Sequence, residues 1–248
     1  MRLRVLGSTG GWPGPGRACS GYLLEAAGRK VLVDAGSGVL VELLRLATPA
    51  ELDAVWISHL HPDHCADLPM LWHTLAYGTP RDRPLPVLGP TGWSAALAPM
   101  LDEPERLGRI FTVVELTDGA RHDFGPLTLR AVAMRHSLPT YGLRASCAGA
   151  ILGYTADSAP CPAVTRLAED ADLFLCEAFL STPGPPRFTS VSRPEDAGRA
   201  ATLGGARRLV LTHLHPDADP GAAITRARTE FAGPVEVAEP GRDFLISG

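Results

Sequence analysis

The segment Ser58–Asp67, with the sequence SHLHPDHCAD, places five possible metal-binding side chains within ten residues. Three of the eight histidines in the chain lie here, together with two carboxylates. The five side chains are His59, His61, Asp63, His64 and Asp67. Imidazole nitrogens and carboxylate oxygens are donors that Zn²⁺, Mn²⁺ and Fe²⁺ accept in proteins. The segment therefore predicts a metal site; the alternative is a polar loop in which the histidines fall together by chance.

Residues 54–57 (AVWI), just before this segment, are apolar and rich in strand formers, which predicts a buried strand. The possible ligands therefore begin where a strand ends. Pro62 predicts that no regular helix runs through the segment. The first two histidines would project together from an extended chain, and the turn at Pro62 would direct Asp63 and His64 to a neighbouring position. One ion cannot easily take all four groups from so short a loop, so the spacing suggests two metal ions.

The composition is that of a globular protein, with 248 residues of which 45% are hydrophobic and 20% charged. A net charge of −4 and the lack of a long basic stripe argue against nucleic acid and anionic membranes as partners. The five cysteines are scattered and form no CxxC pair, which favours a reducing compartment. Neither a secretory signal nor a run of about 18 apolar residues is found, so a cytoplasmic protein is expected.

Apolar runs and helical spacing predict strand-rich stretches with intervening helices along the whole chain. The expected strands are residues 3–6, 20–25, 30–34, 54–57, 87–89, 110–116, 127–134, 150–155, 172–176, 208–212 and 235–238. The expected helices are residues 39–46, 68–75, 91–100 with Thr91 as the cap, 194–203 and 221–231. This order predicts an α/β protein with two sheets packed face to face and helices outside, in a single domain spanning residues 1–248.

Four more polar groups stand where an expected apolar strand stops. They are His136, Asp157, Glu177 and His213. Each one alone is as consistent with a cap or a surface residue as with a ligand. Together with the histidine-rich segment they supply a complete set of ligands for two ions. Two cations about 3.5–4 Å apart need a bridging carboxylate, and Asp157 is the candidate.

The order of these residues resembles that of the metallo-β-lactamase superfamily. HLHPDH is followed by a single histidine, an aspartate in TADS and a strand-ending histidine. The resemblance spans nearly the whole chain and is strongest to the ribonuclease Z-like branch, especially its small actinobacterial-type cyclic-nucleotide phosphodiesterases. The stretches that carry it are SGYLLE, DAGSGVL, SHLHPDHCADLPML, HSLPTYGLR, GYTADS, DLFLCEAF and LVLTHLHP. It implies a four-layer αββα metallo-β-lactamase sandwich.

The resemblance also implies how the ligands divide between two divalent ions, with zinc expected and manganese or iron as alternatives. The first ion would be held by His59, His61 and His136, the second by Asp63, His64 and His213, with Asp157 between them. No organic cofactor is expected. Three further carboxylates would orient ligands through hydrogen bonds, unless they serve only as caps and loop contacts. These carboxylates are Asp34, Asp67 and Glu177.

Two departures from the branch bear on function. Its members carry a further histidine, thought to protonate the leaving oxygen, in an HLT-like stretch that here reads Ser190–Arg193 (SVSR). Either another group, such as His215 or a metal-bound water, takes over this role, or phosphodiesterase activity is weak. His215 is equally consistent with a surface residue. The tRNA-processing members also carry a long arm between the lone histidine and the bridging aspartate. Only twenty residues separate His136 from Asp157 here, so tRNA is not expected as a substrate.

Three functions remain open from the sequence. The first is hydrolysis of a cyclic nucleotide or another small phosphodiester by a metal-bridging hydroxide, with Asp63 taking a proton from the water. The second is a lactonase or thioesterase of the same fold, in which Tyr141, itself expected in a strand, would serve an oxyanion. The third is a non-catalytic metal-binding protein. A homodimer is the expected assembly. Cys65 is expected in the core. Most of the four tryptophans (Trp12, Trp56, Trp72 and Trp93) are expected in the core, and the alternative for one of them is to stack on a base near the cleft.

Overall fold

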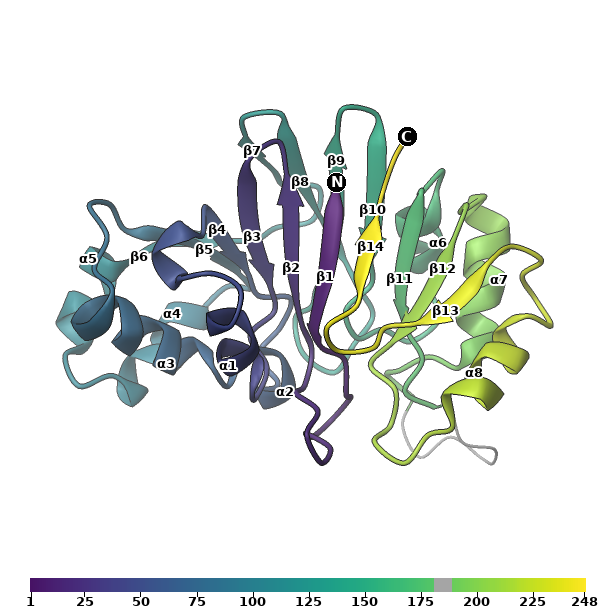
Figure 1. Cartoon of the computed structure of the whole chain (residues 1–248), viewed down its shortest axis with the longest axis horizontal. Helices are drawn as coiled ribbons and strands as arrows, with labels where there is room; N and C mark the ends of the chain where they lie inside the picture. Colours follow the sequence, from purple (N-terminus) through teal and green to yellow (C-terminus); the bar gives the residue numbers. More distant parts are fainter. Residues whose placement is uncertain (181–188) are drawn as a thin grey trace.

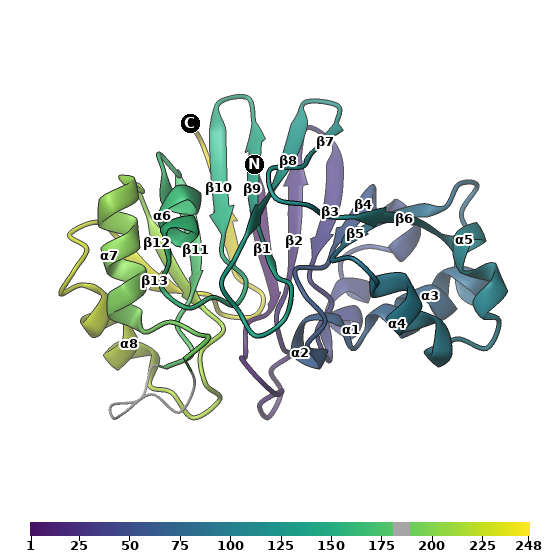
Figure 2. The same cartoon turned by 180° about the vertical axis from the view of Figure 1, so that it is seen from behind.

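The computed structural model describes residues 1–180 and 189–248, and within these ranges the chain forms two seven-stranded sheets (Figures 1 and 2). The first sheet has the strand order β14-β1-β2-β3-β4-β5-β6 and the second β13-β12-β11-β10-β9-β8-β7. The first contains β1 (Arg2–Gly7), β2 (Gly21–Ala26), β3 (Arg29–Val33), β4 (Ala54–Trp56), β5 (Leu85–Gly89), β6 (Phe111–Glu115) and β14 (Asp243–Leu245). The second contains β7 (Arg121–Phe124), β8 (Leu127–Ala133), β9 (Tyr141–Cys147), β10 (Ala150–Tyr154), β11 (Leu173–Glu177), β12 (Leu209–Thr212) and β13 (Val235–Val237).

Helices flank the two sheets on opposite sides of the molecule (Figures 1 and 2). One side carries α1 (Val39–Leu44), α3 (Leu68–His73), α4 (Trp93–Leu97) and α5 (Leu107–Ile110). The other carries α6 (Pro162–Ala168), α7 (Pro194–Gly204) and α8 (Pro220–Ala227). The short helix α2 (Pro62–Cys65) lies at the end of the sheets where the parallel strands finish. None of the helices in the described ranges has the length and hydropathy that a membrane crossing requires.

Within each strand, successive residues alternate between a hydrophobic cluster that lies between the two sheets and a second cluster under the helices on that side. This alternation explains the layered fold. In β2, Tyr22 and Leu24 pack between the sheets, while Leu23 packs under the helices of the first side. In β11, Leu175 packs between the sheets and Phe174 under the helices of the second side. Successive strand side chains point to opposite faces, so a strand covered on both faces must be apolar throughout. The predicted αββα sandwich is therefore confirmed.

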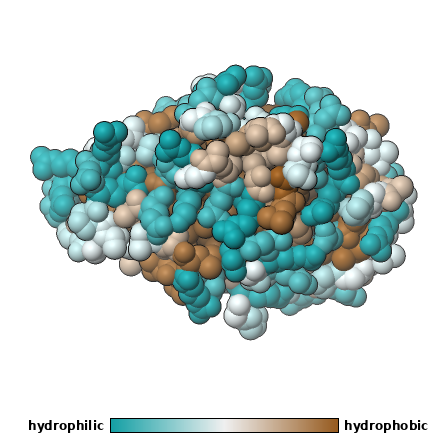
Figure 3. Space-filling view, turned by 45° about the horizontal axis from the view of Figure 1, so that its top comes forward, coloured by the Kyte–Doolittle hydropathy of each residue, from teal (hydrophilic) through white to brown (hydrophobic). Residues whose placement is uncertain are grey.

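The parallel strands bring the possible ligands to one edge of the molecule. Strand β3 runs parallel to β4 in the first sheet, and β10, β11 and β12 are parallel neighbours in the second. The segments that follow these strands therefore leave the sheets at the same end. At the opposite end lie hairpin turns and a pocket of about 590 Å³ that contains none of the possible ligands. A view towards that end shows a largely hydrophilic surface with smaller hydrophobic patches (Figure 3).

Some local predictions were wrong. Pro62 begins helix α2, because a proline at the first helical position forfeits no hydrogen bond. Thr91 is not the cap of α4; Gly92, in a left-handed conformation, precedes the helix, and the regular helix ends at Leu97 before a 3₁₀ turn. Strands β7 and β14 and helices α5 and α6 were not anticipated, because they are short or lack a clear apolar period. Of β9, only Tyr141 was expected in a strand.

Candidate metal centre

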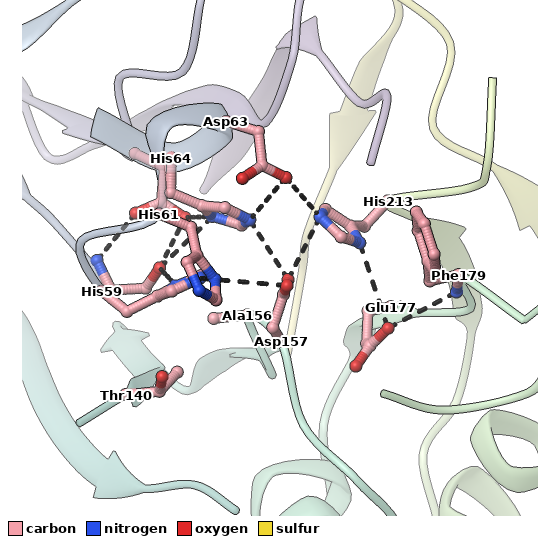
Figure 4. A network of polar contacts seen from close by, with 12 residues as sticks. His59, His61, Asp63, His64, Thr140, Ala156, Asp157, Glu177, Phe179 and His213 are labelled. Atoms are coloured by element: carbon pink, nitrogen blue, oxygen red, sulfur yellow. Dashed lines mark hydrogen bonds and ion pairs between the residues drawn. The ribbon is translucent and has the colours of Figure 1, made fainter. Parts of the chain in front are cut away.

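The structure brings together the seven residues that the sequence proposes as ligands, and Figure 4 labels all of them except His136. His59 and His61 follow β4, and Asp63 and His64 belong to α2. The remaining three come from loops of the second sheet, each shortly after a strand. They are His136 after β8, Asp157 after β10 and His213 after β12. Their donor atoms form two groups, and within each group all atoms lie within 4.8 Å of one another.

The first group consists of three imidazoles and one carboxylate oxygen. His61 Nδ1 lies 2.9 Å from His59 Nε2 and 3.1 Å from His136 Nε2. Asp157 Oδ2 lies 3.9 Å from His59 Nε2 and 3.7 Å from His136 Nε2. Ligands of a tetrahedral zinc ion stand roughly 3.3 Å apart, given bonds of about 2.0–2.1 Å. The separations in this group are close to that spacing.

The second group faces the other oxygen of the same aspartate. Asp157 Oδ1 lies 3.1 Å from His64 Nε2 and 3.3 Å from His213 Nε2. Asp63 Oδ2 lies 3.0 Å from His213 Nε2 and 3.7 Å from His64 Nε2. Asp157 thus presents one oxygen to each group, as a bridging carboxylate would (Figure 4).

Two buried atoms that face each other at the centre, 3.1 Å apart, form no hydrogen bond of acceptable geometry among the residues described by the structure. They are His64 Nε2 and Asp157 Oδ1. A buried polar atom without a partner is unfavourable, and such atoms in native proteins call for an explanation. A divalent cation between a nitrogen and a carboxylate oxygen satisfies both, so the donor set fits a metal ion.

The protonation states of the donors also suit a cation. Burial lowers the pKa of both His59 and His61, which keeps the imidazoles neutral and able to bind metal. Burial opposes ionisation of Asp157, but His213 and His64 outweigh it and lower the pKa of Asp157. Burial likewise opposes protonation of His64, yet Asp157 and Asp34 raise its pKa. A cation at His64 Nε2 would take the place of that proton.

Asp34 orients the second group from behind. Its carboxylate accepts hydrogen bonds from Ser58 N (2.7 Å), Ser58 Oγ (2.9 Å), Tyr154 Oη (2.7 Å) and His64 Nδ1 (2.8 Å). The contact with Nδ1 fixes the ring so that Nε2 points to the centre. Ser58 Oγ also lies 3.1 Å from His59 Nδ1, which links Asp34 to a ligand of the first group. Sequence reasoning missed Ser58 and Tyr154.

The other two proposed orienting carboxylates differ from each other. Glu177 Oε2 lies 4.0 Å from His213 Nδ1, and Oε1 accepts a hydrogen bond from Ser158 N at 2.6 Å. Burial and the charge of Asp157 raise the pKa of Glu177 well above its usual value. Asp67 instead accepts a hydrogen bond from Leu40 N at 2.8 Å and so caps α1. Glu177 therefore belongs to the surroundings of the centre, whereas Asp67 secures a neighbouring helix.

The glycine-rich loop after β1 packs directly on two ligands. Gly11 N donates a hydrogen bond to Asp63 Oδ2 at 2.7 Å. A Cβ at Gly10 would lie 2.7 Å from His213 Nδ1, so only glycine allows this approach. Sequence reasoning did not identify this backbone contact with a possible ligand. The paired glycines at 10 and 11 are the signal that was available.

His215 and Cys65 lie near the centre but outside the two donor groups. His215 is partly exposed, and its Nδ1 accepts a hydrogen bond from Asp217 N at 3.2 Å. Its Nε2 therefore carries the proton of the neutral ring. Cys65 packs against the hydrophobic cluster below α3, and burial raises the pKa of its thiol to about 11. A small packed side chain, as expected from the sequence, describes it better than a ligand.

Comparison with known proteins places the chain in a family. Residues 29–214 match the beta-lactamase superfamily domain. The chain therefore belongs to the beta-lactamase superfamily. Together with the fold and the His/Asp cluster, this membership identifies a metallo-hydrolase of the beta-lactamase fold.

Individual relatives resemble the chain over nearly its full length. The uncharacterized protein ML1173 of Mycobacterium leprae is 38% identical over 99% of this chain and 89% of its own. Ribonuclease Z of Myxococcus xanthus is 29% identical over 97% of this chain and 96% of its own. The crystal structure of the metallo-beta-lactamase fold protein YhfI from Bacillus subtilis matches with a TM-score of 0.88 and 28% identity over 98% of both chains. The predicted kinship with the ribonuclease Z-like branch is confirmed.

Proposed function

We propose that the chain is a phosphodiesterase that binds two divalent ions and hydrolyses a cyclic nucleotide or another small phosphodiester. Zinc is the metal that we expect. The observation that carries this proposal is the pair of donor groups that share Asp157, one oxygen to each. Two cations bound there would supply Lewis acidity towards a phosphate and would lower the pKa of a bound water. The similarity to ribonuclease Z of Myxococcus xanthus supports phosphodiester chemistry.

The side chains around the donors have defined roles in this proposal. Burial alone would raise the pKa of Asp63, but the hydrogen bond with His213 and the charge of His64 lower it, so the carboxylate is ionised at neutral pH. An ionised Asp63 can accept the proton of the attacking water. His215 is partly exposed, and in its protonated form it can donate a proton from Nε2 to the leaving oxygen. Gly11 N holds Asp63 in place at 2.7 Å.

The segment between the lone histidine and the bridging aspartate supports a small substrate. The twenty residues between His136 and Asp157 consist largely of the hairpin β9–β10. No length remains for an arm that would grip a folded RNA, so we do not expect tRNA as a substrate.

A single domain over residues 1–248, a homodimer and a cytoplasmic location stay predictions.

Metal removal and substrate choice test the proposal together. The protein is stripped with a chelator and reloaded separately with Zn²⁺, Mn²⁺ and Fe²⁺, and bound metal is measured by elemental analysis. Each preparation is then assayed with bis-p-nitrophenyl phosphate, cyclic AMP and a homoserine lactone. We expect two metal equivalents per chain, hydrolysis of both phosphodiesters by the loaded protein, and none by the stripped protein.

Single variants locate the two ions. His136→Ala is expected to lose the first ion and His213→Ala the second, whereas His73→Ala, at the end of α3, should keep both. Activity that survives complete metal removal would refute the proposal. Turnover of the lactone alone would favour the carbonyl hydrolase of the same fold. A chain that binds no metal would exclude both the phosphodiesterase and the carbonyl hydrolase.

A further inference from the structure

Three aromatic rings extend from the second donor group towards the surface. Phe179 lies beside His213, with ring centroids 5.5 Å apart (Figure 4). Phe179 is also 5.5 Å from His215, and the His215 ring meets Trp12 edge to face at 5.0 Å and 86°. We call Trp12, Phe179 and His215 the aromatic cluster. It forms a continuous path of rings from a ligand, His213, to an exposed indole.

The position of the indole relative to the donor groups is fixed by the backbone. Gly11 N bonds to Asp63, and Gly10 N donates to Leu214 O at 2.9 Å, next to His213. Trp12 N in turn donates to Gly10 O at 3.0 Å. The loop that carries Trp12 is thus tied to both halves of the second donor group. Trp12 therefore follows directly after the residue whose amide contacts Asp63.

Trp12 is unlike the other tryptophans of the chain. Its exposed fraction is 49%, whereas Trp56, Trp72 and Trp93 are 0 to 1% exposed and belong to the core. Edge-to-face contact with His215 supports the indole on one side without covering it. A large apolar surface is therefore held in a defined place beside the centre.

We propose that Trp12, backed by the aromatic cluster, is a stacking surface for the planar base of the substrate. This inference rests on the proposed function and deepens it, because it selects nucleotides over phosphodiesters without a base. Stacking of a base on an aromatic side chain strengthens binding by about tenfold to a hundredfold. Stacking requires no charged partner. The gain in affinity should be largest for purines, because they have the larger ring system.

Calorimetry with product-like probes separates the base from the phosphate. Zinc-loaded wild-type protein and the variants Trp12→Ala and Trp12→Phe are titrated with 5′-AMP and with ribose 5-phosphate. Leu203→Ala, which removes a 69% exposed apolar side chain from the far end of α7, is the matched control. We expect Trp12→Ala to weaken AMP about tenfold to a hundredfold and ribose 5-phosphate hardly at all. Trp12→Phe should retain most of the affinity, and the control all of it.

The emission of Trp12 gives a second readout. Because the other three indoles are buried, AMP should quench wild-type fluorescence, and the quenching should be absent in Trp12→Phe. Equal weakening of both probes by Trp12→Ala, or of neither, overturns the inference. The inference is also overturned if Trp12→Ala keeps its affinity for AMP but no longer self-associates in sedimentation experiments. The indole would then pack against a second copy of the chain and not against a base.

The two proposals fail separately. Selective loss of AMP binding in a protein that hydrolyses no cyclic nucleotide would support the stacking surface and remove the phosphodiesterase. Hydrolysis of cyclic AMP with the same KM in wild type and Trp12→Ala would support the phosphodiesterase and exclude the stacking surface.

Discussion

The Asp34 carboxylate accepts four hydrogen bonds although none of its surface is exposed. A buried carboxylate is tolerated only when its oxygens are satisfied in this way. Its backbone is left-handed, with φ of 59°, a conformation that aspartate adopts more readily than most residues. Through Ser58 and His64 this one side chain aligns ligands of both donor groups.

Tyr154→Phe tests how far Asp34 depends on its neighbours. The variant removes one hydrogen bond to the carboxylate, which should lower the free energy of unfolding by about 1–2 kcal/mol. It should also weaken zinc binding about tenfold, because the ring of His64 is held less firmly. Urea unfolding and competition with a zinc chelator measure the two effects.

Tyr22→Phe is the matched control. The two tyrosines pack against each other at 5.3 Å in the same buried layer, but the Tyr22 hydroxyl contacts Thr212 Oγ1 and not Asp34. A similar loss of stability with unchanged zinc affinity is expected. If both variants changed zinc affinity equally, Asp34 would have no special part in holding the ligands.

The sequence identifies the possible donor residues but not the residues that hold them in position. Seven possible ligands are recognisable because histidines and aspartates follow the strands in the order of the superfamily that the chain resembles. The partner of Asp34, Tyr154, is 120 residues away in sequence, and the contact exists only because the two sheets face each other. Packing across sheets leaves no periodic trace in the chain, so such partners need a structure.

At the scale of elements, helix α2 depends on the loop that follows β3. Ala35 N donates to His64 O at 2.8 Å, and Asp67 N donates to Ala35 O at 2.9 Å. Gly36 lies so close that an added Cβ would be 2.1 Å from the carbonyl oxygen of Asp63. The two segments are therefore in backbone contact, and the ligands of α2 are positioned by that contact.

Gly36→Ala should push α2 away from this loop. We expect a loss of about 1–3 kcal/mol in the free energy of unfolding, as for other overpacked sites. One metal equivalent should be lost, because Asp63 and His64 move together. Gly108→Ala in α5 is the control, since nothing lies within 4 Å of an added Cβ and alanine favours helix by about 1 kcal/mol. Retention of both ions in Gly36→Ala would show that α2 is placed by other contacts.

Elements were predictable where burial is uniform. Strands such as β11 and β12 are buried throughout and apolar up to their last residue, because helices cover one face and the other sheet covers the second. Strand β7, with the sequence RHDF, is exposed or half-buried at every position and offers no such signal. Its place in the sheet follows from pairing with β8, which local sequence does not encode.

At the scale of the whole molecule, the donors come from both sheets. Four belong to the segment after β4 in the first sheet, and three follow β8, β10 and β12 in the second. A cation in either group would therefore be held by residues of both halves. Binding to the folded state alone raises stability in proportion to the logarithm of the free metal concentration.

Metal removal should accordingly lower the thermal midpoint of the entire chain. At a free concentration about 1,000 times the dissociation constant, a bound ion stabilises by about 4 kcal/mol, or on the order of 10 °C for this length. Differential scanning calorimetry of loaded and stripped protein measures the shift. Mg²⁺, a poor partner for imidazole, should not restore the midpoint, whereas Zn²⁺ should. An unchanged midpoint after stripping would mean that the cations do not connect the two sheets.

The split origin of the donors has a consequence for biosynthesis. A chain emerging from the ribosome displays His59, His61, Asp63 and His64 early, but His213 follows only after another 149 residues. Domains fold as units as translation proceeds, so the early histidines wait in an incomplete cage. We therefore expect cation uptake to be a late step of maturation, which is completed only after His213 has left the ribosome.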